Sequence, residues 1–110
     1  MKEIKAFVKP FKVNDICHHL IEAGFPNLTV SSAEGTGNLE NSDPSVSTQF
    51  SITDSQVAKI EIVCNKENVD KIVAIISEQG RTGTPGDGLI YISDVEKAFR
   101  VKTGKDIRLD

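Results

Sequence analysis

The sequence contains no long apolar run. No stretch approaches the roughly 20 apolar residues that a membrane-spanning helix needs. The opening residues, MKEIKAFVKPF, interleave charged and apolar side chains, whereas a signal peptide has an unbroken apolar core. We therefore expect a cytoplasmic protein that does not insert directly into a membrane.

The chain has no excess of positive charge, and cysteine is scarce. The formal net charge is −3, whereas a protein whose main task is to bind nucleic acid needs a clustered excess of Lys and Arg. We therefore expect no nucleic-acid partner.

The two cysteines, Cys17 and Cys64, are too far apart for a metal-binding CxxC pair. We expect buried thiols rather than a disulfide.

Signals of catalysis and of metal binding are weak. No serine or cysteine is accompanied by a recognisable base and orienting group, so nothing indicates an enzyme. His18 and His19 are neighbours on a predicted helix, where successive side chains point about 100° apart and cannot both bind one metal ion. The carboxylates Asp43 and Asp54 lack EF-hand spacing. We expect no catalytic site and no metal site.

Two strand–helix–strand units are present in what we expect to be a single domain, residues 1–110. Hydrophobic residues make up 38% and charged residues 26% of the chain, as is typical of a folded domain. Hydrophobic periodicity predicts each element. The strands are predicted at 2–9, 27–35, 58–64 and 88–93, and the helices at 12–24 and 65–80.

This order predicts an α+β fold, the ferredoxin-like split βαβ repeat (βαββαβ), with both helices on one face of a four-stranded antiparallel sheet. In the first helix, Asn14 or Asp15 can cap the start, and Gly24 is placed to stop it. Residues 95–110 form a C-terminal extension, in which we expect a short helical turn and then an extended piece, FRVKTG.

The sheet face away from the helices is predicted to be mixed. Alternation places Phe7 and Val63 on it among Lys and Glu residues. Such a face can be solvated, or it can be covered by another copy of the chain. We favour an oligomer, because one domain of this length offers only a modest core.

Residues 35–56 are predicted to form a long flexible loop. They show no sustained period, and loops longer than about 12 to 15 residues are uncommon unless they are functional or disordered. Such a loop can become ordered on meeting a ligand or a partner, which is how a small domain without catalysis reports binding.

The stretch RTGTPGDGLIYI, residues 81–92, has three glycines and a proline close together. It is not a Walker loop, because the Gly-Lys-Ser/Thr ending is missing and a strand follows instead of a helix. The glycines allow backbone N–H groups to approach a phosphate, but a simple tight turn is an alternative reading.

Other residues strengthen the case for a nucleotide cleft. Gly35 and Gly37 stand at the start of the long loop. The second strand and the segment before the fourth can meet at one sheet edge or across a subunit boundary. Arg100 and Lys102, two apart on an extended segment, would point the same way toward a phosphate. Each feature alone also fits a turn or a solvated surface.

The chain resembles the P-II nitrogen-regulatory signal-transduction family. The resemblance is carried by the segments MKEIKAFVKPFKVNDICHHLIEAGFPNLTV, GTG, KIEIV, RTGTPGDGLIYI and FRVKTG. The resemblance covers nearly the whole chain. It implies a non-enzymatic homotrimer that binds adenine nucleotides (ADP, AMP or ATP) in clefts between subunits. It also implies that residues 35–56 are the family's T-loop, which engages a target such as a membrane transporter or a metabolic enzyme.

The resemblance also implies roles for individual residues. Gly86, Asp87 and Gly88 would cradle the phosphates, Leu28 and Thr29 would help to hold the base, and Arg100 and Lys102 would reach the phosphates across the subunit boundary. The remaining residues expected in the cleft are Phe7, Gly35, Thr36, Gly37, Asn38, Val63 and Leu89.

Departures from the family pattern indicate a divergent, P-II-like member. Asn38 and Leu39 stand where the family usually has Arg-Gln, and Val57 stands where it commonly has lysine. We therefore expect the response to 2-oxoglutarate to be lost, and magnesium binding stays open. Leu89 replaces another usual lysine, so ADP or AMP should compete well with ATP.

Two further points concern modification and the alternative function. The loop contains no tyrosine, since the single tyrosine is Tyr91, so uridylylation of the loop is excluded.

The alternative to a nucleotide sensor is a trimeric divalent-cation or heavy-metal-tolerance protein of the same fold. That reading leaves TGTPGDG unexplained.

Overall fold

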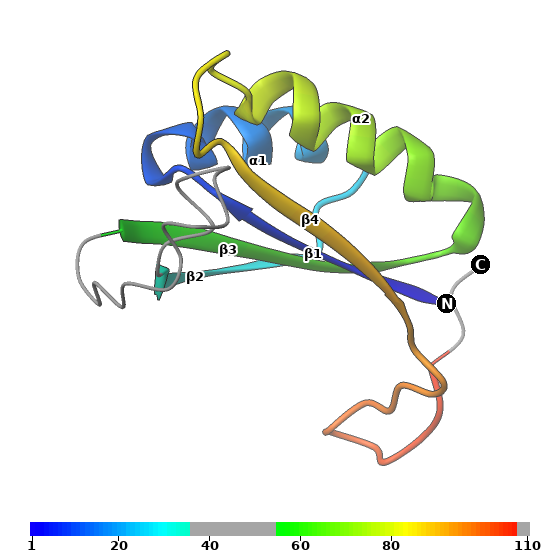
Figure 1. Ribbon diagram of the computed structural model, residues 1–110. Helices are drawn as coiled ribbons and strands as arrows, with labels where there is room; N and C mark the ends of the chain where they lie inside the picture. Colours follow the sequence, from blue (N-terminus) through cyan, green and yellow to red (C-terminus); the bar gives the residue numbers. More distant parts are fainter. Residues whose placement is uncertain (36–54, 108–110) are drawn as a thin grey trace.

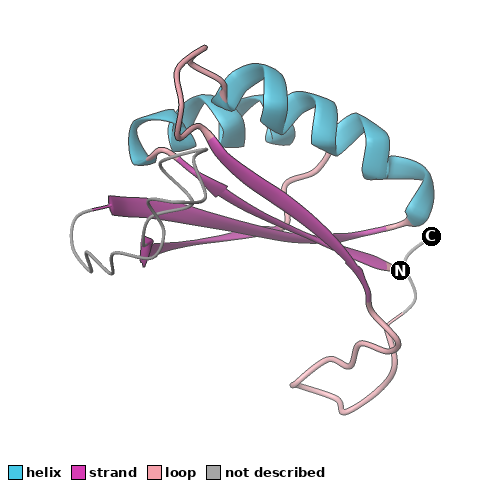
Figure 2. Cartoon of the chain, viewed as in Figure 1, coloured by secondary structure: helices cyan, strands magenta, loops and turns pink. Residues whose placement is uncertain are grey.

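The computed structural model describes residues 1–35 and 55–107 of the chain. Its helices and strands follow the predicted order (Figures 1 and 2). The strands are β1 (Lys2–Val8), β2 (Leu28–Gly35), β3 (Ser55–Cys64) and β4 (Gly88–Asp94). The helices are α1 (Val13–Glu22) and α2 (Val69–Gly80), preceded by the 3-10 turns η1 (Pro10–Lys12) and η4 (Lys66–Asn68).

The four strands form one antiparallel sheet in the order β2-β3-β1-β4. Both helices lie on the same face of this sheet, as Figure 2 shows. This arrangement confirms the predicted α+β fold with βαββαβ order. The strand β3 begins at Ser55, earlier than the apolar alternation alone suggested.

The core lies between the sheet and the two helices. Every second residue of β1 and β3 points toward the helices, which is the period of a strand. Ile4 and Ile60 from the sheet are fully buried against Ile16 and Ile72 from the helices. The other buried core residues are Ala6, Val8, Leu20, Ala58, Ile62, Cys64 and Ile76. Both cysteines are free thiols. Cys64 is buried, as predicted, whereas Cys17 is only partly buried.

The predicted cap of the first helix is wrong. Lys12 occupies the N-cap position and makes no side-chain capping hydrogen bond. Because the 3-10 turn that begins with Pro10 leads directly into the helix, Asn14 and Asp15 already lie inside its first turn. The predicted stop is confirmed, since Gly24 has a φ of +98°, a conformation that favours glycine.

The C-terminal extension forms a small hairpin that projects from the end of β4 (Figure 1). Phe99 bridges Asp106, and the backbone N–H of Ile107 donates to the carbonyl of Ala98 at 2.8 Å. Neither the predicted helical turn nor a continuous extended segment is found, because residues 101–103 form the turn of the hairpin. Val101 at this turn is fully exposed.

The predicted long loop lies mostly outside the described residues. Gly35 ends β2, and Ser55 and Gln56 begin β3 directly opposite, with Gly35 paired to Ser55. Both ends of the 36–54 segment are therefore fixed at one end of the sheet.

Candidate functional site

The loop of residues 82–87 joins α2 to β4 and depends on glycine. Gly83 and Gly86 have φ values of +83° and +87°, which other residues rarely adopt. Gly88 begins β4 with a φ of +119° and lies against the backbone of Phe7 in β1. The glycines are thus required by the backbone path of the loop, as well as leaving room for a ligand.

The carboxylate of Asp87 organises this loop from the inside. It accepts hydrogen bonds from the backbone N–H of Thr82 at 2.7 Å and of Gly83 at 3.2 Å. It also accepts a hydrogen bond from the Thr82 hydroxyl. Those two backbone N–H groups are therefore already in use. Only the remaining N–H groups of the loop are left for a bound anion.

These contacts change the acidity of Asp87. The hydrogen bond from the Thr82 side chain, together with those from the backbone of Thr82 and Gly83 and from Lys9, lowers the pKa of Asp87 from 3.8 to about 2. The carboxylate is thus ionised at neutral pH. Its negative charge makes Asp87 a poor direct partner for a phosphate, and its observed contacts are those that shape the loop.

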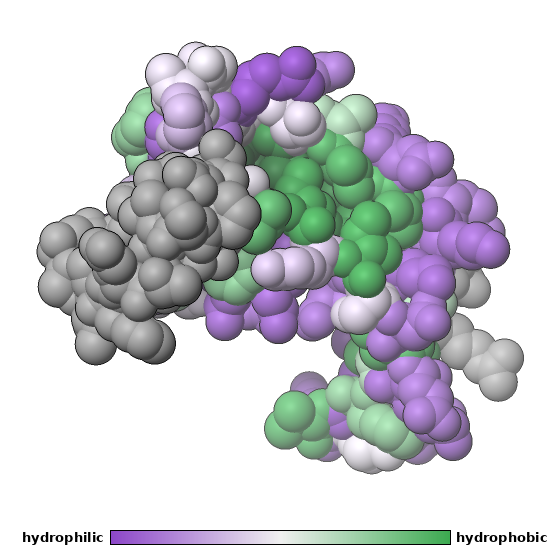
Figure 3. Space-filling view, viewed as in Figure 1, coloured by the Kyte–Doolittle hydropathy of each residue, from purple (hydrophilic) through white to green (hydrophobic). Residues whose placement is uncertain are grey.

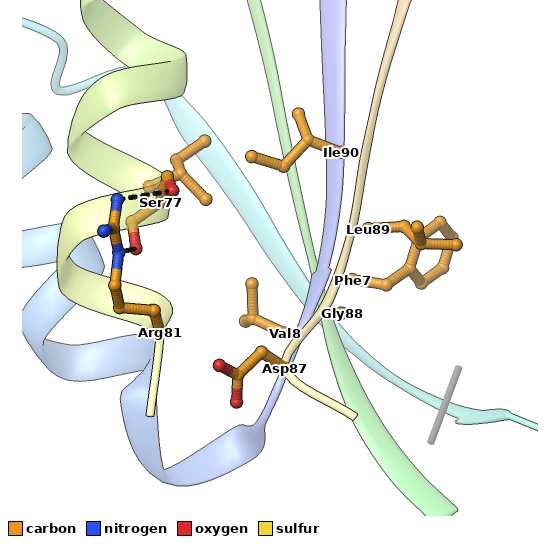
Figure 4. Close-up of a pocket in the computed structure, with 10 residues that line it drawn as sticks. Phe7, Val8, Ser77, Arg81, Asp87, Gly88, Leu89 and Ile90 are labelled. Carbon is orange, nitrogen blue, oxygen red and sulfur yellow. Dashed lines mark hydrogen bonds between the residues drawn. The ribbon is translucent and has the colours of Figure 1, made fainter. Parts of the chain in front are cut away.

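A cavity of about 100 Å³ lies between the end of α2 and the strands β1 and β4 (Figure 4). Val8, Ile90 and Asp87 face it from the sheet, while Phe7 and Leu89 point together toward the opposite face of the sheet. The guanidinium of Arg81 donates to the carbonyl and the hydroxyl of Ser77, both at 3.0 Å. Arg81 is therefore engaged by its own helix in this structure.

A second cavity, of about 240 Å³, connects the loop with the start of β3. It is lined by Lys9, Gln56, Val57, Pro85 and Gly86. Val57, which stands where a lysine was expected, is buried and pairs with Ala33 of β2. An anion in this cavity would meet the ammonium of Lys9 rather than a lysine at position 57.

Two adjoining cavities lie at the other end of the sheet, beside the C-terminal hairpin. The larger, about 380 Å³, includes Thr29, Glu61 and Val63 in its lining. The smaller, about 310 Å³, includes Val63 and Arg100. Predicted base-binding and phosphate-binding residues therefore share one region of the subunit.

Sequence reasoning did not single out Glu61, which the structure places beside two of the predicted site residues. Glu61 is paired in register with Thr29, and it shares the larger cavity with Thr29 and Val63. Its carboxylate lies 3.4 Å from the ammonium of Lys59. The signal was present in the sequence, because alternation along β3 places Glu61 and Val63 on the same face.

The remaining predicted site residues differ in where the structure places them. Leu28 pairs with Ile62 and packs against the core, on the opposite face of β2 from Thr29. Thr36, Gly37 and Asn38 lie outside the described residues. The geometric argument for Arg100 and Lys102 is wrong, because the turn at 101–103 replaces the extended segment on which it depended.

The sheet order separates the two glycine segments. Gly35 is in β2 at one edge and Gly88 is in β4 at the other, with β3 and β1 between them. The possibility that they meet at one edge of the same subunit is therefore excluded. The possibility that they meet across a subunit boundary is compatible with this order.

Within residues 1–35 and 55–107, no group of three or more His, Cys, Asp or Glu side chains is arranged to hold a metal ion. In the same residues, no helix is long and apolar enough to cross a membrane.

Comparison with known proteins yields one family. The family model described as "Nitrogen regulatory protein P-II" matches residues 1–105. Proteins named nitrogen regulatory protein P-II from Pasteurella multocida and Nostoc punctiforme are 34% and 35% identical over 107 and 106 residues. These matches cover 96% of this chain and 96% and 95% of the relatives.

A third relative of that name, from Porphyra purpurea, is 36% identical over 104 residues, which is 94% of this chain and 93% of the relative. The matches therefore extend over nearly the full length of all three relatives. With the βαββαβ fold and the glycine loop before β4, they show that the chain belongs to the P-II family of nitrogen regulatory proteins.

Proposed function

We propose that this protein is a non-enzymatic signalling protein that binds adenine nucleotides in clefts between the subunits of a homotrimer. The observation that carries the proposal is the division of the predicted site into two groups. The loop group is Phe7, Gly86, Asp87, Gly88 and Leu89. The base group is Thr29, Glu61 and Val63, together with the hairpin residue Arg100.

Thr29 of the base group lies in the edge strand β2, whereas Gly88 and Leu89 of the loop group lie in the opposite edge strand β4. Thr29 pairs with Glu61, which pairs with Lys5, which pairs with Tyr91. Three strand spacings, about 14 Å, therefore separate Thr29 from β4. A nucleotide that joined both groups in one subunit would have to cross the open sheet face over Lys5 and Phe7. Edges of two neighbouring subunits can instead bring the groups together.

The exposed apolar residues support an assembly. On the open face, Leu89 is 44% and Tyr91 53% exposed, and the ring of Tyr91 packs edge-on against Phe7 at 5.9 Å between centroids. Apolar side chains also gather where β4 adjoins α2, and on the hairpin (Figure 3). Burying these surfaces against other copies would stabilise a trimer.

The chemistry of each group suits a different part of the ligand. A carboxylate such as that of Glu61 accepts hydrogen bonds from the exocyclic amino group of adenine, and Thr29 offers a hydroxyl beside it. The glycine loop offers backbone N–H groups for a phosphate. Leu89 and Val57 are apolar where the family usually has lysine, so we propose that ADP and AMP compete well with ATP and that 2-oxoglutarate has no effect.

We propose that the segment between Gly35 and Ser55 passes the binding signal on to another protein. Gln56 lines the cavity that also contains Gly86, so a ligand at the loop would lie beside the end of this segment. We propose that the segment acts on a protein target such as a membrane transporter or a metabolic enzyme in the cytoplasm.

Calorimetry tests the binding function. Titrations with ADP, AMP and magnesium-ATP, with and without 2-oxoglutarate, should show binding of ADP or AMP and no change on adding 2-oxoglutarate. A rise in ATP affinity with 2-oxoglutarate would contradict the reading of Val57. Absence of binding for all three nucleotides would reject the function.

Subunit mixing tests where the site is. Glu61→Ala disables the base group by removing the acceptor, and Gly86→Asp disables the loop group while keeping a residue type that tolerates positive φ. Each variant alone should lose nucleotide binding. Co-refolded mixtures should regain part of it, because each mixed trimer contains one cleft with both groups intact. A mixture that stays inactive would place the site within one subunit.

A further inference from the structure

Lys9 lies between the loop of residues 82–87 and the rest of the subunit. It directly follows β1 and precedes Pro10, whose ring fixes the backbone there. Its side chain is half-buried, and its ammonium group lies 3.0 Å from the Thr84 hydroxyl, 3.3 Å from the Thr82 hydroxyl and 3.4 Å from a carboxylate oxygen of Asp87. One side chain thus contacts both sides of the loop.

The contacts around Lys9 form a directional chain of hydrogen bonds. The two threonine hydroxyls are 2.6 Å apart, and the Thr82 hydroxyl donates to Asp87. Since Thr82 uses its only proton on Asp87, Thr84 must donate to Thr82 and accept from Lys9. The ammonium of Lys9 is therefore joined to the carboxylate of Asp87 both directly and through the two hydroxyl groups, and hydrogen bonds in such a connected network strengthen one another.

The loop needs such a restraint because its backbone is permissive. Gly83 and Gly86 both have positive φ and would sample many conformations without external contacts. Ordering them when a ligand arrives would reduce affinity. Lys9 is anchored on a core strand, so it can order the loop beforehand.

We propose that Lys9 is a positioning residue for nucleotide binding, which holds the 82–87 loop in its binding shape by linking Thr82, Thr84 and Asp87 to the end of β1. This inference rests on the proposed nucleotide-binding function. Lys9 acts through the loop, because its charge is matched by Asp87 and its donors point at the loop oxygens.

The test compares Lys9→Gln, Lys9→Arg and a matched control, Lys71→Gln. Lys71 is an exposed lysine on α2, so the control removes the same charge away from the loop. We expect Lys9→Gln to weaken ADP binding about tenfold, Lys9→Arg to stay within about threefold of the wild type, and Lys71→Gln to have no effect. Circular dichroism confirms that each variant is folded.

A second measurement needs no nucleotide. Amide hydrogen exchange of Thr82 and Gly83 in the ligand-free protein should become about tenfold faster in Lys9→Gln and stay unchanged in Lys71→Gln, because these amides are protected by the network that Lys9 supports. A residue that only touched a phosphate directly would leave this exchange unchanged.

The two measurements distinguish a failure of the role of Lys9 from a failure of the proposed nucleotide-binding function. If the wild type binds ADP and Lys9→Gln binds it equally well, or loses binding without faster exchange, the role of Lys9 is overturned while the proposed function stands. If the wild type binds no adenine nucleotide, the proposed function fails, and the role of Lys9 in binding fails with it.

Discussion

Gly88 lies so close to Phe7 that a Cβ atom added to Gly88 would be 1.7 Å from the Phe7 carbonyl oxygen. The φ of Gly88 is +119°, which is also unfavourable for any residue with a side chain. The clash is with backbone at the end of the paired strands β1 and β4, so no side-chain movement can relieve it. The last glycine of the Gly-Asp-Gly segment is therefore required by the fold.

We accordingly expect Gly88→Ala to lower the free energy of unfolding by more than about 3 kcal/mol. Chemical denaturation followed by circular dichroism measures this change. The control is Gly104→Ala in the hairpin, where φ is +69° but no atom lies near the added Cβ, and where we expect a cost of about 1 kcal/mol. Equal costs at the two positions would contradict the packing argument.

The acidity of Asp87 makes part of the stability depend on pH. Its pKa is lowered to about 2 in the folded protein, below the 3.8 of an unperturbed group. The contribution of the ionised carboxylate is therefore complete above about pH 4 and is lost as the pH falls from there toward 2. The wild type should be more stable than Asp87→Asn at pH 7, and this difference should shrink on acidification.

Removing the main hydrogen-bond donor tests the cause of this shift. The Thr82 hydroxyl is the largest contributor, so Thr82→Val should raise the pKa of Asp87 toward 3.8. An NMR titration of the Asp87 carboxyl carbon reports this directly. A pKa that stays near 2 in Thr82→Val would show that backbone donors alone account for the acidity.

Leu89 offers a gain-of-function test of nucleotide preference. Its side chain is exposed beside Phe7, so a lysine can be placed there without burying charge. We expect Leu89→Lys to raise the affinity for ATP by about tenfold or more, since one charge-assisted contact contributes about 1.5 to 3 kcal/mol. Calorimetry with ATP and AMP should show a smaller gain for AMP, which lacks the outer phosphates.

The control for that experiment is Leu89→Met, which preserves an apolar side chain of similar volume. It should leave the ATP-to-AMP affinity ratio unchanged. An equal gain for ATP and AMP in Leu89→Lys would indicate general electrostatic attraction rather than a contact with the outer phosphates.

The two thiols should react slowly in the folded protein. Burial raises the pKa of both Cys17 and Cys64, so little reactive thiolate is present at neutral pH. Cys17 is partly exposed and Cys64 is buried, so labelling by a thiol reagent should modify Cys17 first and both rapidly only in denaturant. Faster labelling of Cys64 would show that the end of β3 opens readily.

The strands and helices were predictable because their hydrophobic periods are regular. Alternation placed Ile60 and Ile62 on one face and Glu61 and Val63 on the other, and the register confirms it. The predicted caps at Asn14 and Asp15 failed because a 3-10 turn, invisible to periodicity, shifted the start of the helix. The prediction that Arg100 lies on an extended segment was wrong, because the bridge between Phe99 and Asp106 folds that segment into a hairpin.

Many individual residues of the candidate site were predictable from the sequence, but the contacts between them were not. The glycine loop was found from composition, yet the inward direction of the Asp87 carboxylate follows only from its contacts with Thr82 and Gly83. Lys9 was not predicted at all, since its contacts are with residues more than 70 positions away in the chain.

The sequence by itself determined the element order, the faces of the strands, the glycine loop and the family resemblance. These depend on local periodicity and on residue types at short spacing, which the chain carries without folding. Tertiary structure alone decided that β2 and β4 lie at opposite edges, that Gly88 cannot carry a side chain, and that Lys9 joins the loop to β1. Those relationships depend on strand pairing and on contacts between distant segments, which come into being only when the sheet is assembled.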